Sequence, residues 1–91
     1  MDGTALITGA SGGIGRALAF RFAEAGNNLV LASRDEERLE SLALEIRSKY
    51  GIDVKIVAID LAEEGAAARL HGAGAGMDIK FLVNSAGFGD Y

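Results

Sequence analysis

The stretch Thr4-Ala-Leu-Ile-Thr-Gly-Ala-Ser-Gly-Gly-Ile-Gly15 begins with a short apolar run and ends in a cluster of glycines. Hydrophobic residues then recur three or four positions apart, at Ile14, Leu18, Phe22 and Ala25. This spacing is that of an amphipathic helix. The patterns together predict a strand over residues 4–8, a tight turn, and a helix from about Gly13 to Ala25. Gly26 follows this helix and suits the left-handed cap position.

The glycine-rich turn is suited to holding an anion. Glycine adopts backbone angles that are closed to other residues, and its missing side chain lets a ligand approach the main chain. The helix that follows directs unpaired backbone N–H groups, and the positive end of its dipole, toward the turn. A diphosphate is the anion that best matches such a place. The alternative is a glycine-rich turn that holds no ligand.

Three further apolar runs, at residues 29–32, 54–59 and 80–83, predict three more strands. A second helix is predicted between the first two, with an apolar face of Leu39, Leu42, Ala43, Ile46 and Tyr50 and with Gly51 at its end. At its start, Ser33 and Glu36 have the spacing of a capping box.

Residues 61–76 are harder to interpret, because an alanine-rich run lies among several glycines. The run at 66–70 is compatible with a short helix, which Gly65 and Gly72 weaken. We predict a flexible connector over Gly72, Gly74 and Gly76, with His71 facing solvent.

Strands that alternate with helices predict an α/β fold. We expect the first half of a Rossmann-type doubly wound parallel sheet, with its strands in the order 3-2-1-4. Ligands of such sheets bind at the carboxyl ends of the strands. The informative residues follow those four ends: Gly9 to Gly15, Ser33-Arg34, Asp60, and residues 84–87.

Composition narrows the class of protein. The 91 residues allow one small domain, and a net charge of −4 with scattered basic residues argues against nucleic acid or an anionic membrane as a partner. The absence of cysteine excludes disulfides and thiolate zinc sites. No basic segment precedes a long apolar stretch, and no apolar run reaches membrane-spanning length. We therefore expect a cytoplasmic protein without a bound metal.

Three motifs resemble those of the classical short-chain dehydrogenase/reductase family, and the resemblance covers essentially the whole chain. They are the glycine motif Thr8-Gly9-Ala10-Ser11-Gly12-Gly13-Ile14-Gly15, the adenine-binding pair Asp60-Leu61, and the turn Asn84-Ser85-Ala86-Gly87, in which Ser85 replaces the second Asn of Asn-Asn-Ala-Gly. Because Gly12 and Gly13 are adjacent, the glycine motif also satisfies that of the extended, epimerase-like branch. The Asn-x-Ala-Gly turn favours the classical branch.

The resemblance implies a dinucleotide cofactor, and the end of the second strand indicates NADP. Ser33 occupies the place where an acidic residue would accept hydrogen bonds from the adenosine ribose, and Arg34 follows it. A guanidinium binds a 2′-phosphate through paired, charge-assisted hydrogen bonds, whereas a carboxylate repels it. Arg38, one turn along the helix, is a second candidate. The alternatives are ion pairs of Arg34 with Glu37 and of Arg38 with Asp35.

The other two strand ends are expected to contact the rest of the cofactor. Asp60 with Leu61 would hold the adenine edge, although Asp60 also has helix-cap spacing to Glu63. Asn84 would fix the main chain of its turn, where Ala86 and Gly87 leave room for the nicotinamide ribose.

The family's catalytic residues are a Ser, a Tyr-x-x-x-Lys pair and a further Asn, all after the fourth strand, and this chain contains none of them. We therefore predict that residues 1–91 are an NADP-binding half-domain of an oxidoreductase whose full-length parent acts on a carbonyl or alcohol, and that the half-domain is inactive. Alternatives are a non-catalytic dinucleotide-binding or redox-sensing module and an epimerase-like relative. The fourth strand, as an open sheet edge, predicts self-association.

Overall fold

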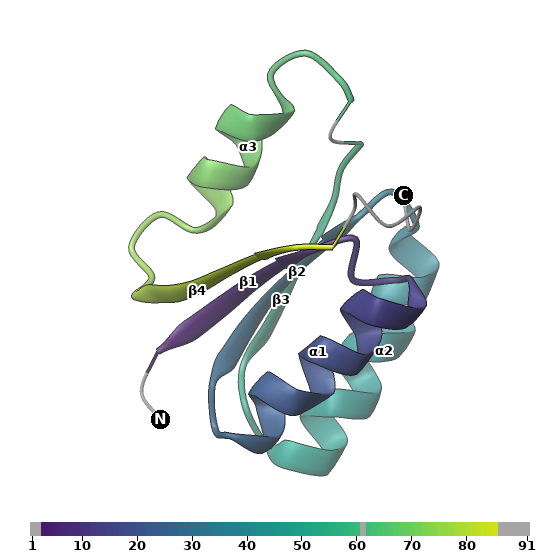
Figure 1. Ribbon diagram of the computed structural model, residues 1–91, viewed down its shortest axis with the longest axis vertical. Coiled ribbons are helices and arrows are strands. Elements are labelled where there is room, and N and C mark those ends of the chain that lie inside the picture. Colours follow the sequence, from purple (N-terminus) through teal and green to yellow (C-terminus); the bar gives the residue numbers. More distant parts are fainter. Residues whose placement is uncertain (1–2, 61, 86–91) are drawn as a thin grey trace.

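The computed structural model describes residues 3–60 and 62–85, in which strands and helices alternate. The elements are β1 (Thr4–Thr8), α1 (Gly13–Glu24), β2 (Asn28–Ser33), α2 (Glu36–Tyr50), β3 (Val54–Ala58), α3 (Ala66–Ala73) and β4 (Ile79–Asn84). The described strands form one parallel sheet in the order β3-β2-β1-β4 (Figure 1). The predicted first-half Rossmann order is confirmed.

Helices cover both faces of the sheet. α1 and α2 pack on one face and α3 lies over the other (Figure 1). This follows from right-handed crossovers: the chain moves outward from β1 to β3, then returns past β1 to β4, so the third helix must lie on the opposite face. The central strand β1 is accordingly buried along its whole length.

Two apolar clusters form the core, one under each helical layer. The cluster beneath α1 and α2 includes the fully buried Ile7, Leu29, Leu31, Leu39 and Ile46. The smaller cluster beneath α3 contains Leu6, Val30, Ala32, Ile59, Ala66 and Leu70. Alternate residues of β1 and β2 therefore face opposite helical layers, as strand geometry requires.

The ends of α1 and α2 largely agree with the sequence. α1 ends one residue earlier than predicted, and Gly26 after it has a φ of 89°. Gly26 thus has the predicted left-handed conformation, and Gly51, predicted as the end of α2, ends it with a φ of 68°. The predicted capping box at the start of α2 is wrong. Asp35 is its N-cap, because α2 begins at Glu36, three residues after Ser33, and Ser33 still belongs to β2.

The predicted connector after β3 is wrong in part, because residues 66–73 form α3 and Gly72 lies inside it. Ala66 and Leu70 are buried against the sheet. Burial of a leucine contributes about 1.5–3 kcal/mol, more than the ~1 kcal/mol that one helical glycine costs. His71 is exposed, as predicted.

An irregularity in β4 determines which side chains face α3. Thr4 pairs with Ile79 but Ala5 pairs with Phe81, so Lys80 is an extra residue in the ladder. Ile79 therefore packs with the α3 cluster, while Phe81 and Val83 pack against the α1 and α2 cluster. Between the latter two, Leu82 is 72% exposed.

Candidate functional site

The turn after β1 is anchored to its neighbours by main-chain hydrogen bonds. Gly9 has a φ of 67°, a conformation that favours glycine. The N–H of Ala10 donates to the carbonyl of Ala32 on β2 at 3.2 Å, and the N–H of Gly12 donates back to the carbonyl of Gly9 at 3.2 Å. The turn is thus held in shape before any ligand arrives.

Gly13 and Gly15 of the motif differ in the space around their Cα atoms. A Cβ at Gly15 would overlap the carbonyl oxygen of Gly9 and lie 2.8 Å from both the Cα of Ala10 and the Oγ of Ser85. A Cβ at Gly13, in contrast, meets no atom of the described residues within 4 Å. Gly15 is therefore required by packing within the protein, whereas the space beside Gly13 is open to a ligand.

The N-terminus of α1 has no side-chain cap among the described residues. Its N-cap is Gly12, and within the described part of the chain no acidic residue lies in the first turn of the helix. Ile14 in that turn is 46% exposed. The first N–H groups of a helix have no intrahelical partners, and the helix dipole adds positive potential there.

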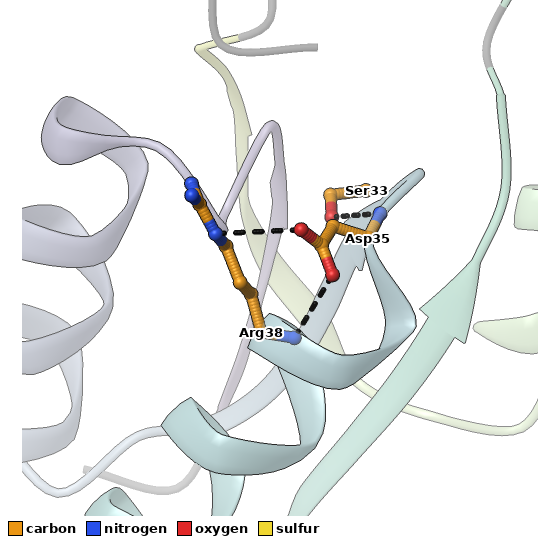
Figure 2. Close-up of polar contacts among 3 residues, drawn as sticks. All are labelled: Ser33, Asp35 and Arg38. Carbon is orange, nitrogen blue, oxygen red and sulfur yellow. Dashed lines mark hydrogen bonds and ion pairs between the residues drawn. The ribbon is translucent and has the colours of Figure 1, made fainter.

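Ser33, Asp35 and the predicted Arg38 form a network of polar contacts at the start of α2 (Figure 2). The hydroxyl oxygen of Ser33 accepts from the N–H of Asp35 at 3.1 Å, and Oδ1 of Asp35 accepts from the N–H of Arg38 at 3.1 Å. Nε of Arg38 lies 3.3 Å from Oδ2 of Asp35, with side chains 70% and 45% exposed. The alternative role considered for Arg38, an ion pair with Asp35, is thus present. Arg34 is exposed at the end of β2.

A groove of about 280 Å³ runs between the start of α1 and α2, lined by Ser11, Arg16, Arg38, Ser41, Leu42 and Glu45. It brings Ser11 of the glycine motif together with Arg38 of the second predicted region. Arg16 pairs with Glu45 at 3.0 Å, with both side chains about half exposed. Exposed ion pairs contribute about 0–1 kcal/mol, so a strong anion can compete for either guanidinium.

At the end of β3, Asp60 shapes a turn. Its Oδ1 accepts from the N–H of Ala62 at 2.9 Å. The N-cap of α3 is Gly65, so the alternative interpretation of Asp60 as a helix cap is wrong. Its predicted partner Leu61 lies outside the described residues.

At the end of β4, the hydroxyl of Thr8 donates to Oδ1 of Asn84 at 2.9 Å and joins the two strand ends. Ser85 is 1% exposed, and its hydroxyl donates to the carbonyls of Thr8 and Gly9. The sequence assigned the fixing of the main chain to Asn84 and missed Ser85, whose only signal was its place in the motif. Ala86 and Gly87 lie outside the described residues.

The sheet register brings the strand ends level with one another. Thr8 pairs with both Ala32 and Asn84, and Ser33 pairs with Ala58. The described candidate residues therefore lie at, or directly after, the carboxyl ends of the strands, on one side of the molecule. They are Thr8, Gly9, Ser11, Gly12, Gly13, Ile14, Gly15, Ser33, Arg34, Arg38, Asp60 and Asn84.

The family model described as short chain dehydrogenase matches residues 3–90. The chain belongs to the short chain dehydrogenase family. Over 85 residues it is 44% identical to a very-long-chain 3-oxoacyl-CoA reductase of Scheffersomyces stipitis, covering 91% of this chain and 25% of that protein. It is 42% identical over 77 residues to a 7beta-hydroxysteroid dehydrogenase of Collinsella aerofaciens, covering 85% of this chain and 29% of that one.

A solved structure of a short-chain dehydrogenase from Sphingobium yanoikuyae in complex with NADPH is 40% identical and superposes with a TM-score of 0.82. The match covers 88% of this chain and 32% of that one. The chain thus spans about a quarter to a third of the length of these members of the short chain dehydrogenase family.

The described residues have neither a membrane-spanning helix nor a cluster of metal ligands. None of their helices combines the length and apolar character needed to cross a membrane. They also contain no group of three or more His, Cys, Asp or Glu side chains placed to hold a metal ion.

Proposed function

We propose that this chain is the NADP(H)-binding part of an NADP-dependent short chain oxidoreductase. The observation that carries the proposal is the start of α1, where N–H groups without a side-chain cap face a rigid turn and the space beside Gly13 is open. That donor set fits a diphosphate, which is bound by N–H groups and a helix dipole. When bound, the cofactor supplies or accepts the hydride.

The preference for NADP over NAD is assigned to Arg34 and Arg38, and Ser11 lines the same groove as Arg38. The side chain at the end of β2 is the uncharged Ser33, which is buried and bonded to the main chain. It therefore places no carboxylate where a 2′-phosphate would lie. The family member from Sphingobium yanoikuyae was solved with NADPH, which supports this assignment.

The remaining strand ends are assigned to the rest of the cofactor. Asp60 with Leu61 would accept a hydrogen bond from the adenine amine, since a carboxylate has two oxygens and Ala62 engages Oδ1. Asn84, Ala86 and Gly87 would border the nicotinamide ribose.

The chain itself is proposed to bind cofactor without turnover. Its 91 residues contain no Tyr-x-x-x-Lys sequence to supply the family's general acid/base. A parent protein of the relatives' length would act on a carbonyl or alcohol in the cytoplasm. The two curated relatives described above are named as a reductase and a dehydrogenase.

Calorimetric titration with NADP and NAD tests the cofactor proposal. NADP should bind more tightly than NAD, and Arg34→Ala should lower NADP affinity about 10- to 100-fold, because charge-assisted hydrogen bonds contribute about 1.5–3 kcal/mol. NAD affinity should change little. Arg69→Ala, which removes an exposed arginine of α3, is the matched control and should alter neither affinity.

Two results would overturn parts of this proposal. Equal affinities for the two nucleotides would remove the role of Arg34, and no binding of either by folded protein would remove cofactor binding itself. Turnover of NADPH with a ketone by the 91-residue chain would contradict the proposed inactivity.

We further propose that β4, an edge strand of the described sheet, pairs with a second copy of the chain. Leu82 on this strand is 72% exposed and borders an apolar groove of about 640 Å³ beside α3. Open edges with exposed apolar residues favour pairing between chains.

In analytical ultracentrifugation the protein should dimerise as its concentration rises. Leu82→Glu should remain monomeric, while Leu44→Glu, at a leucine that is 65% exposed on α2, should not. A monomeric parent chain at all concentrations would disprove this pairing.

A further inference from the structure

Ser85 links the end of β4 to the beginning of the glycine turn. Its single hydroxyl proton is shared between the carbonyl of Thr8, the nearer acceptor, and the carbonyl of Gly9 at 3.3 Å. Its own N–H donates to the Thr8 carbonyl at 3.3 Å. The side chain is 1% exposed, so these contacts form where water does not compete with them.

The carbonyl oxygen of Gly9 is shared between Ser85 and the start of α1. It accepts from the Ser85 hydroxyl at 3.3 Å and from the N–H of Gly12 at 3.2 Å. Gly12 is the N-cap of α1, and the N–H groups assigned to the diphosphate come directly after it. One oxygen atom therefore connects the buried side chain of Ser85, directly after β4, to the proposed phosphate site.

The space around the Ser85 hydroxyl is small. A Cβ at Gly15 would lie 2.8 Å from the Ser85 Oγ, so the hydroxyl lies against the main chain of α1 as well as that of the turn. A serine is short enough for this place and carries a donor. Alanine would remove the side-chain donor, and the Thr8 and Gly9 carbonyls would keep only their main-chain donors, the N–H groups of Ser85 and Gly12.

We propose that Ser85 is a positioning residue for the nucleotide: by holding the Gly9 carbonyl, it keeps the glycine turn and the first N–H groups of α1 in the arrangement that receives a diphosphate. This inference rests on the proposed cofactor function. Ser85 acts through Gly9 and Gly12, and it needs no contact with the ligand itself.

The experiment compares two ligands that differ in their use of the turn. NADP carries both a diphosphate and a 2′-phosphate, whereas adenosine 2′-monophosphate carries only the latter. Ser85→Ala should lower the affinity for NADP about five- to tenfold, as expected for a lost hydrogen bond. The affinity for adenosine 2′-monophosphate should change less than twofold. Partial unfolding would lower both apparent affinities by the same factor, so a change in their ratio separates positioning from general stability.

Two further variants complete the design. Ser85→Cys fills the same buried site with a weak donor, so it should reproduce the selective loss even if Ser85→Ala folds poorly. Ser48→Ala removes an exposed serine of α2 and should leave both affinities unchanged. An unchanged affinity ratio in folded Ser85→Ala or Ser85→Cys would overturn the inference while leaving cofactor binding intact.

Amide hydrogen exchange without nucleotide distinguishes the proposal that Ser85 positions the glycine turn from the proposal that the chain binds NADP. Ser85→Ala should speed exchange at residues 10–15 more than at Ala5, Leu6 and Ile7 of β1. If the parent chain binds no nucleotide but exchange still rises at the turn, the cofactor proposal fails and the link from Ser85 to the turn stands. Uniform exchange changes would disprove that link.

Discussion

Gly15 at the start of α1 packs directly against Gly9 in the preceding turn, so that a Cβ at Gly15 would overlap the Gly9 carbonyl oxygen. This contact explains why the motif has glycine at position 15: packing within the chain leaves no room for a side chain there. Gly13, two residues earlier, has no such contact among the described atoms. Gly15 is therefore required for packing, whereas the open space beside Gly13 is where the proposed nucleotide would approach.

Gly15→Ala should lower the free energy of unfolding by about 1–3 kcal/mol, the usual cost of forcing extra atoms into a packed site. Main-chain atoms of Gly9 and Ala10 surround the new methyl group, and they cannot rotate away as a side chain can. Urea unfolding monitored by circular dichroism measures the change. A variant as stable as the parent chain would show that the turn can move away from α1.

Gly13→Ala should leave stability unchanged or slightly raised, because its Cβ meets open space and alanine is the better helix former. The same methyl group would occupy the space proposed for the diphosphate. NADP affinity should therefore fall by about tenfold, equivalent to ~1.4 kcal/mol, in a calorimetric titration. Unchanged affinity would place the nucleotide elsewhere.

Asp35→Asn should tighten NADP binding about two- to fivefold relative to NAD, since it removes the carboxylate that now pairs with Arg38. Asparagine caps helices about as well as aspartate, so stability should hold. Glu40→Gln removes the same charge from an exposed position of α2 and is the matched control. If both variants raise NADP affinity equally, net charge rather than Arg38 is responsible.

Leu70→Ala should destabilise the protein by about 2–3 kcal/mol, because the leucine joins α3 to the sheet and its removal leaves a cavity. Leu44→Ala, at an exposed leucine of α2, should change stability by less than about 0.5 kcal/mol. Urea unfolding compares the two. Amides of residues 66–73 that exchange as fast as an unfolded peptide in the parent chain would favour the flexible connector instead.

The sequence predicted the sheet order, because strand and helix periods alternate and right-handed crossovers allow few arrangements. It failed at α3. The glycines among residues 65–76 lower the helix propensity around an alanine-rich run. Burial of Ala66 and Leu70 against the sheet favours the helix there, and local propensity does not report that burial. The sequence also predicted Ser33 as the cap of α2, whereas the N-cap is Asp35. Spacing alone cannot tell which of several polar residues adopts the cap conformation.

The sequence by itself determined which residues follow each strand, and therefore which could lie together at the carboxyl edge of a parallel sheet. Tertiary structure decided their contacts. It brought Ser85 to the carbonyl of Gly9, 76 positions earlier in the chain, and Ser11 beside Arg38. Such contacts depend on strand register and on side-chain packing across the sheet edge, and neither is encoded in the local spacing of residues.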